Sequence, residues 1–142
     1  ERHPDAQFSV HMIRQWKERF SFVGEPKDRV VVTTPVRGKA TELDITNEMR
    51  TACESILPPI CETMQDILSK VEPDFQDKVR NNVILAGGTS LITGLTDAIQ
   101  KALVELGGGR ATVVKDPVFA GSDGGLAIAR DASNADWEKL SL

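Results

Sequence analysis

The segment NNVILAGGTSLITGL, from Asn81 to Leu95, constrains the fold of this chain more than any other. Its apolar run predicts a buried β-strand, and the two adjacent glycines predict a turn with a positive φ at one of them. Next, TGLTDAIQKALVELGGG has leucine and isoleucine at helical spacing, so it predicts an amphipathic helix that Gly107 ends. The runs ATVVKD and DPVFAGSDGGLAIARDA repeat this order of strand, glycine loop and helix. Such alternation predicts an α/β layered domain with right-handed crossovers.

The first part of the chain predicts a smaller α+β unit. SVHMIRQWKERFSFVG has the apolar spacing of a helix, and Ser9 is placed to cap its start. DRVVVTTPVRGKATELDI predicts a β-hairpin that turns at residues 37–39. Pro35 favours an edge position for its strand, because proline lacks a backbone N–H.

A long helical pattern joins the two parts. It begins near Thr46, which we predict to be its N-cap, and its apolar residues recur every three or four positions. Pro58 and Pro59 must kink or restart this helix, because proline removes a backbone donor and clashes with the preceding turn. A short polar link to the first strand of the α/β part is expected after it. We place the boundary between two structural units, residues 1–57 and residues 58–142, at the paired prolines.

Composition argues against several classes of protein. With 40% hydrophobic and 27% charged residues among 142, the chain has enough apolar material for a packed core. The net charge of −4 argues against nucleic-acid binding, and no apolar run approaches the roughly 18 residues of a membrane span. Two cysteines and two histidines give little support to a metal site and indicate a reduced, cytoplasmic setting. Because the sequence starts without a methionine, we expect a fragment of a longer protein.

The Gly87-Gly88 turn is the first candidate site. It is either a plain turn in which Thr89 or Ser90 caps the next helix, or a place where a flat ligand lies against bare backbone. In α/β sheets, ligands gather at the carboxyl ends of strands, and this turn lies at such an end. No GK[ST] or GxGxxG pattern follows the strand, which argues against direct phosphate binding and permits contact with a base or a ribose.

The helical segment RQWKERF, from Arg14 to Phe20, is the second candidate. Its charged residues are either a solvated helix face beside a buried Trp16, or a binding group. In the second interpretation, Glu18 accepts hydrogen bonds from two ribose hydroxyls, and Lys17 places a cation near a base or a phosphate. The residues alone leave both interpretations open.

The third candidate, DPVFAGSDGG, contains Asp123, which could act as a general base. No histidine or second carboxylate lies nearby in the sequence, so we interpret Ser122 and Asp123 as helix-capping residues. Cys53 and Cys61 are predicted to lie in the core, because no Cys–His arrangement supports a nucleophile.

These three stretches occur in an order that resembles the bacterial branch of the actin family. HMIRQWKERFSFVG is similar to the family segment that carries a Lys-Glu pair, NNVILAGGTSLITGL to its adenosine motif, and KDPVFAGSDGGLAIA to its last nucleotide-side loop and helix. Within that branch, the chain resembles the magnetosome actins and, more distantly, the cell-shape actins. The resemblance covers essentially the whole chain but only the second lobe of the actin-like, ribonuclease H-like ATPase fold.

The resemblance implies a nucleoside site. ATP or ADP with Mg would bind between two lobes, with adenine over the paired glycines and the ribose on a helix glutamate. The positions carried over are Arg14 at the pocket edge, Lys17, Glu18, Gly87, Gly88, Thr89 and Ile92, the last of which stands where actin has a tyrosine. The phosphate hairpins, the magnesium-side aspartate and the water-positioning residues lie elsewhere in the family fold. No residue of this chain is therefore expected to be catalytic or to ligate the metal.

At the level of function, the resemblance implies a cytoskeletal ATPase. The whole protein would polymerise head-to-tail with copies of itself, lie in the cytoplasm and position magnetosomes through an adaptor protein, with no nucleic-acid partner and no membrane insertion. Two alternatives stay open. One is a lobe of a sugar kinase or another ATPase of the Hsp70 superfamily, and the other is a non-enzymatic interaction domain whose Gly-Gly turn is only structural.

Overall fold

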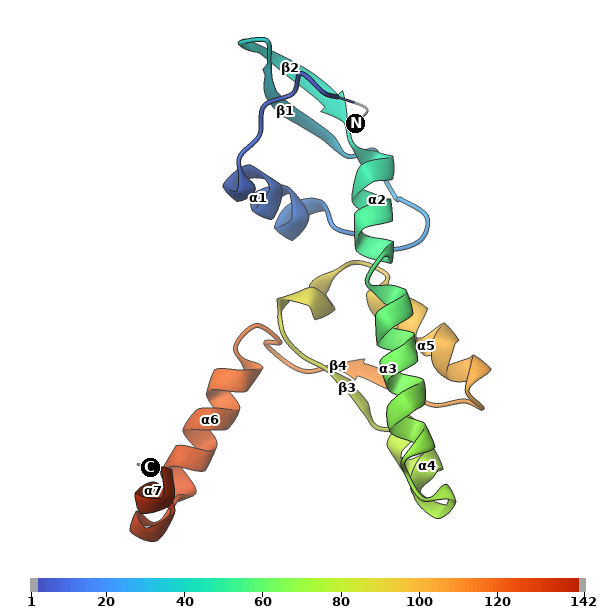
Figure 1. The fold of residues 1–142 in the computed structure, drawn as a ribbon, viewed down its shortest axis with the longest axis vertical. Helices are drawn as coiled ribbons and strands as arrows, with labels where there is room; N and C mark the ends of the chain where they lie inside the picture. Colours follow the sequence, from blue (N-terminus) through green and yellow to red (C-terminus); the bar gives the residue numbers. More distant parts are fainter. Residues whose placement is uncertain (1–2, 141–142) are drawn as a thin grey trace.

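The computed structural model describes residues 3–140. Its helices are α1 (Val10–Phe20), α2 (Thr46–Glu54), α3 (Leu57–Ser69), α4 (Pro73–Arg80), α5 (Leu95–Glu105), α6 (Ala120–Asp131) and α7 (Asn134–Leu140), with one 3-10 turn, η1 (Gly88–Leu91). Its strands are β1 (Val31–Val36), β2 (Lys39–Asp44), β3 (Val83–Leu85) and β4 (Ala111–Val113). Figure 1 shows an upper part with α1, β1, β2 and α2, a lower part with α3, α4, α5 and the β3–β4 sheet, and an arm formed by α6 and α7. No helix within residues 3–140 is long and apolar enough to cross a lipid bilayer.

Three local predictions are confirmed. Ser9 caps α1, because its hydroxyl oxygen accepts a hydrogen bond of 3.2 Å from the N–H of the third helical residue. Strands β1 and β2 pair in an antiparallel hairpin whose two-residue turn has φ of 50° at Arg37 and 79° at Gly38, a left-handed conformation that suits tight hairpins. The long helical pattern breaks into α2 and α3, and Pro58 and Pro59 lie in the first turn of α3, where no intrahelical N–H is required.

The predicted N-cap, Thr46, has a different role. Ile45 occupies the N-cap position of α2, and Thr46 is the first helical residue. The Thr46 hydroxyl accepts a hydrogen bond of 2.8 Å from the N–H of Val30 and donates one of 2.6 Å to Oδ1 of Asp44. Because Val30 directly precedes β1 and Asp44 ends β2, this hydroxyl holds the base of the hairpin on the start of α2.

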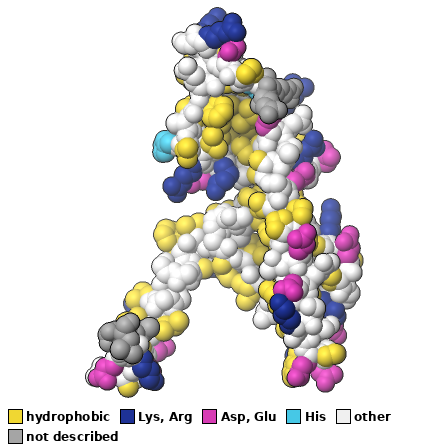
Figure 2. Space-filling model, in the orientation of Figure 1, with side chains coloured by type: hydrophobic (Ala, Val, Ile, Leu, Met, Phe, Trp, Pro, Cys, Tyr) yellow, Lys and Arg dark blue, Asp and Glu magenta, His cyan; other side chains and the backbone are white. Residues whose placement is uncertain are grey.

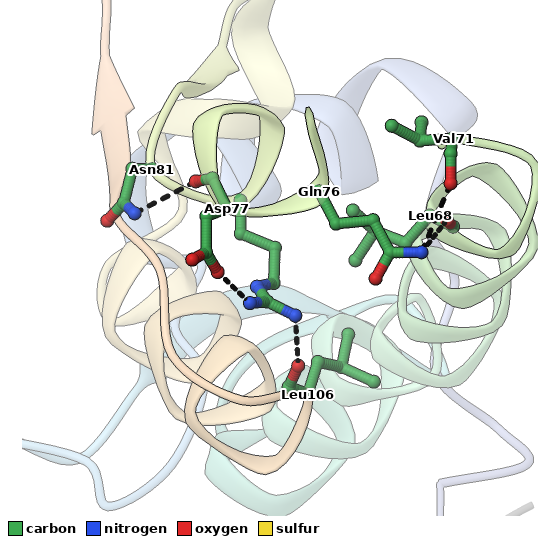
Figure 3. A network of polar contacts seen from close by, with 7 residues as sticks. Leu68, Val71, Gln76, Asp77, Asn81 and Leu106 are labelled. Atoms are coloured by element: carbon green, nitrogen blue, oxygen red, sulfur yellow. Dashed lines mark hydrogen bonds and ion pairs between the residues drawn. The ribbon is translucent and has the colours of Figure 1, made fainter. Parts of the chain in front are cut away.

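The prediction of a short polar link before β3 was wrong, because that stretch forms the helix α4 (Pro73–Arg80). Pro73 starts it at a position where proline is favourable. Figure 3 shows how polar contacts attach this short helix to its neighbours. Arg80 pairs with Asp77 within α4 and donates a hydrogen bond of 3.0 Å to the carbonyl of Leu106 just after α5. Gln76 donates to the carbonyl of Leu68 in α3 and to that of Val71 just after α3. The bond from Arg80 to Leu106 joins residues far apart in the sequence and attaches this helix to the end of α5.

The inner core surrounds α5. Leu95, Ile99 and Leu103 are between 0% and 2% exposed, and this confirms the apolar face predicted for that helix. Cys53 of α2 is buried in the same cluster, as predicted, whereas Cys61 is only half-buried. Burial of several large aliphatic side chains is worth about 1.5–3 kcal/mol each, so this cluster is the main stabilising contact between α2, α3 and α5.

The prediction of a buried strand at β3 is only half right. β3 and β4 pair in parallel, with Val83 opposite Ala111 and Leu85 opposite Val113. One face of this two-stranded sheet packs on the core, but Ile84 points to the other side and is 57% exposed. The strand therefore has the apolar sequence of a strand buried on both faces, while the described residues cover one face only.

The interpretation of Ser122 and Asp123 as helix caps was wrong. Phe119 is the N-cap of α6, and no side chain caps that helix end. Ser122 donates a hydrogen bond of 2.9 Å to the carbonyl of Phe119, while Asp123 lies in the first turn. A carboxylate there interacts favourably with the positive end of the helix dipole, which accounts for its position without any catalytic role.

Asp136 forms hydrogen bonds that hold the start of α7, and they lead us to expect that acid loosens that helix. Its carboxylate accepts hydrogen bonds from the hydroxyl and the N–H of Ser133, and these bonds lower the pKa of Asp136 from its ordinary value of 3.8. Because these bonds favour the ionised carboxylate, they stabilise the folded helix above pH 3.8. This stabilisation is lost as the pH falls through the lowered pKa of Asp136 in the folded protein. We expect acid to fray α7, detected by fluorescence of the half-exposed Trp137 in a Trp16→Phe background. Asp136→Asn should remove this step, and an identical acid titration in both proteins would contradict the assignment.

Candidate functional site

The Gly87-Gly88 turn has the backbone that its sequence predicts. Gly87 has φ of 80°, whereas Gly88 starts η1 with no positive φ. The hydroxyl of buried Ser90 donates a hydrogen bond of 2.7 Å to the Gly87 carbonyl, and the Gly87 N–H donates one of 2.7 Å to the carbonyl of Pro117. A Cβ atom at either glycine would meet no atom within 4 Å. Nothing in the described fold therefore requires Gly88 to lack a side chain, and the space in front of it is open.

The end of α1 is attached directly to the segment that follows this turn. Phe22 forms a parallel β-bridge with Thr93, the Val23 N–H donates to the Thr93 carbonyl at 2.8 Å, and the Thr93 N–H donates to the Ser21 carbonyl at 3.3 Å. Gly94 makes this approach possible, because a Cβ atom there would lie 2.6 Å from the Val23 carbonyl oxygen. Two candidate segments that are about 70 residues apart in the sequence are thus joined through their backbones.

A hollow of about 470 Å³ lies between α1, the hairpin and α2. Hydrophobic side chains gather in this upper part of the molecule in Figure 2. Three predicted site residues, Lys17, Thr89 and Ile92, line the hollow. The other lining residues are His3, Ala6, Phe8, Ile13, Trp16, Val32, Thr34, Leu43, Ile45, Glu48, Met49, Ala52, Cys53 and Ile56. The walls are mainly apolar, so the hollow suits a flat or aliphatic group better than a phosphate.

The remaining predicted residues lie outside the walls of the hollow. Arg14 and Glu18 pair with each other on the surface of α1, with Nε of Arg14 2.9 Å from Oε1 of Glu18, and their side chains are 73% and 55% exposed. Gly87 and Gly88 do not line the hollow either, although Thr89 directly after them does. The structure thus brings Lys17, Thr89 and Ile92 together, and it leaves Glu18 exposed on the neighbouring position of the same helix.

Several residues of the hollow were not recognised as candidates from the sequence. Met49 and Cys53 were predicted only as core positions of the long helical pattern, and Trp16 only as a buried neighbour of the charged residues. Their apolar spacing was the available signal, but spacing alone does not show whether a side chain fills a core or lines a hollow. Within residues 3–140, no group of three or more His, Cys, Asp or Glu side chains is arranged to hold a metal ion.

The comparison with known proteins was made at the levels of family, sequence and structure. No protein-family model matches the chain. The actin-like protein MamK of Paramagnetospirillum magneticum is 36% identical over 140 residues, and that of Magnetospirillum gryphiswaldense is 34% identical over 140 residues. Each alignment covers 99% of this chain. The chain spans 40% and 39%, respectively, of the length of these relatives.

The solved structures that resemble this chain include structures of MamK as well. A MamK double helical filament superposes with a TM-score of 0.88 and 36% identity, over 93% of this chain and 41% of the other. A non-polymerising MamK mutant bound to AMPPNP superposes with a TM-score of 0.78 and 37% identity, over 83% of this chain and 36% of the other. The resemblance inferred from the three motifs and the actin-like fold class are confirmed. Over nearly its whole length, the chain is therefore homologous to one part of the MamK actin-like filament proteins.

Proposed function

We propose that this chain is the second, C-terminal lobe of an actin-like cytoskeletal ATPase and contributes the nucleoside half of its ATP site. Residues 1–57 form the outer subdomain of that lobe, and residues 58–142 form the inner, nucleotide-side subdomain. The α2–α3 break beside the paired prolines supports this division, because the cluster under the hairpin is built entirely from residues that precede it, while Cys53 and Met49 of α2 connect the two parts by packing on the α5 core as well.

One observation carries the proposal: the backbone bonds of Ser21 and Val23 to Thr93 join the end of α1 to the segment that follows the Gly-Gly turn. In the proposed complex, adenine lies over Gly87 and Gly88, where the backbone faces open space. Lys17, Thr89 and Ile92 line the neighbouring hollow. Glu18 then accepts hydrogen bonds from the ribose hydroxyls, and Arg14 lies at the pocket edge. Ile92 offers apolar contact without aromatic stacking.

The chain's own residues bind and orient the nucleoside, and none of them is assigned to catalysis. The bound ATP or ADP carries Mg, which offsets the phosphate charge and is held mainly by the phosphates and the first lobe. Hydrolysis is therefore a property of the whole ATPase, and the isolated chain should be inactive.

The proposed partner is a second copy of the same protein. The structures most similar to this chain include MamK filaments, in which copies of one protein assemble. A heterologous contact that does not close into a ring generates such a filament. We place the filament in the cytoplasm, where it would position magnetosomes through an adaptor protein. The net charge of −4 does not favour a nucleic-acid partner, and no direct membrane insertion is proposed.

Two other functions make different predictions. A sugar-kinase or Hsp70-type ATPase lobe would bind ATP without forming filaments, and an interaction domain would not bind ATP at all. The first needs room for a sugar-binding insertion, for which the short connections around β3, α5 and β4 leave little space. The filament-forming relatives favour the cytoskeletal function over both.

Sedimentation of the longer protein that contains this chain tests the proposal. We expect it to pellet in the presence of ATP and Mg, and to remain in the supernatant without nucleotide. Saturable sugar phosphorylation without pelleting would favour the kinase alternative, and the absence of ATP binding in a titration would favour the interaction domain. Either result would contradict the proposed function.

A further inference from the structure

Arg14 forms an ion pair with Glu18, the carboxylate to which the proposed ribose binds. The two residues are one helical turn apart on α1, and Nε of Arg14 donates to Oε1 of Glu18 at 2.9 Å. Lys17, which lies between them in the sequence, lines the hollow instead. The guanidinium of Arg19 lies 5.1 Å over the ring of Phe20. Within the described residues, Arg14 is thus the basic group of this helix that contacts the Glu18 carboxylate.

This ion pair contributes little to the stability of the fold. Both side chains are more than half exposed, and exposed pairs at this spacing are screened by water and salt. The main physical effect of the contact is on Glu18 itself, because a long acidic side chain that is bonded at one oxygen samples fewer rotamers.

The contact also leaves one of the two carboxylate oxygens of Glu18 able to accept hydrogen bonds from a ligand. A carboxylate has two oxygens with about four acceptor positions, and Arg14 uses one oxygen only. The backbone bonds between residues 21–23 and Thr93 attach the helix that carries this carboxylate to the segment that follows the Gly-Gly turn. A group held in one orientation before binding loses less conformational freedom when the ligand arrives.

We propose that Arg14 is a positioning residue, which orients the Glu18 carboxylate so that its free oxygen accepts hydrogen bonds from the ribose hydroxyls. Arg14 thereby sets the preference for a ribonucleotide over a deoxyribonucleotide without contacting the sugar. The inference rests on the proposed function, because it needs a ribose at Glu18. It adds a role for a residue whose side chain otherwise lies on the surface with no structural task.

The test compares affinities for ATP and for 2′-deoxy-ATP and 3′-deoxy-ATP in the longer protein. We expect wild type to prefer ATP by about tenfold, as a hydrogen bond to a charged group would give. Glu18→Gln should reduce this ratio to near one. Arg14→Gln should reduce it by about threefold or more, and Arg14→Lys should restore only part of it, because lysine lacks the planar fork of arginine. Arg19→Gln is the matched control and should keep the wild-type ratio.

The outcomes separate the two proposals. If Arg14→Gln keeps the wild-type ratio while Glu18→Gln loses it, the nucleoside site stands and the positioning role of Arg14 is wrong. If wild type binds no nucleotide, or if Glu18→Gln keeps the wild-type ratio, the placement of the ribose at Glu18 is wrong, and the inference falls with it. Circular dichroism of each variant checks that α1 remains helical, so that a ratio changed by unfolding is recognised.

Discussion

Replacing Gly88 by valine in the longer protein is expected to weaken ATP binding by at least about a hundredfold, while the lobe still folds. The expectation follows from the room that the fold leaves at Gly88 and from the proposed position of the adenine. Gly88 does not have a positive φ, and a Cβ atom there would meet nothing within 4 Å, so the fold has room for a side chain. The same open space is where the proposed adenine lies, so an isopropyl group there excludes the base by steric overlap.

A graded series makes the test specific. Gly88→Ala places one methyl group in the site and should weaken ATP binding less than Gly88→Val. Ala40→Val adds a valine at an exposed position of the β1–β2 hairpin, outside the Gly87-Gly88 site. It should leave both ATP affinity and thermal unfolding unchanged. ATP titration by calorimetry gives the affinities, and thermal unfolding shows that each variant is folded. Unchanged affinity in a folded Gly88→Val protein would exclude adenine from this turn.

Local chemistry explains which parts of the fold could be predicted from the sequence. The Ser9 cap, the Arg37-Gly38 turn and the restart at Pro58 each depend on a few adjacent residues, and each is present in the structure. The face of α5 follows from its own periodicity, and it too is buried as predicted. In these segments, the conformation that a residue prefers and the one that the fold needs are the same.

The errors arose where distant residues decide the structure. Helix α4 depends on the bonds of Arg80 and Gln76 to α5 and α3, which its own sequence does not reveal. Thr46 bonds to Val30 rather than capping its helix, because the hairpin base comes close to it. The exposure of Ile84 depends on which elements cover the β3–β4 sheet. Hydrophobic patterning indicates that a face is apolar, but it does not identify what packs against it.

For the candidate site too, the features that depend on adjacent residues could be predicted, and those that depend on distant residues could not. The Gly-Gly turn was predictable from composition, and its positive φ at Gly87 is present. The proximity of Lys17 to Thr89 was not predictable from any local pattern, because it depends on the bridge between Phe22 and Thr93. Only the order of motifs, compared with a known family, indicated that these segments meet. The nucleotide roles of the residues stay predictions until binding is measured.

Gly94→Ala is expected to destabilise the protein by roughly 2–4 kcal/mol, the second large effect that the structure predicts. Gly94 has φ of 81°, which a residue with a Cβ atom adopts only with strain, and that Cβ atom would lie 2.6 Å from the Val23 carbonyl oxygen. The backbone must move to relieve this overlap, and the bonds between Val23 and Thr93 are the nearest ones to break. Denaturant unfolding followed by circular dichroism measures the change in free energy.

Gly38→Ala is the matched control, because Gly38 has nearly the same φ, 79°, but a Cβ atom there meets nothing within 4 Å. It should cost only about 1 kcal/mol, the strain of the backbone without the overlap. Equal destabilisation by both variants would mean that the approach of Val23 to Gly94 is not a tight contact. If the proposed site is correct, folded Gly94→Ala protein should also lose ATP affinity, because the helix bearing Lys17 and Glu18 is no longer held beside the turn. Gly88→Val should instead lose affinity at unchanged stability, so the pair distinguishes a blocked site from a displaced one.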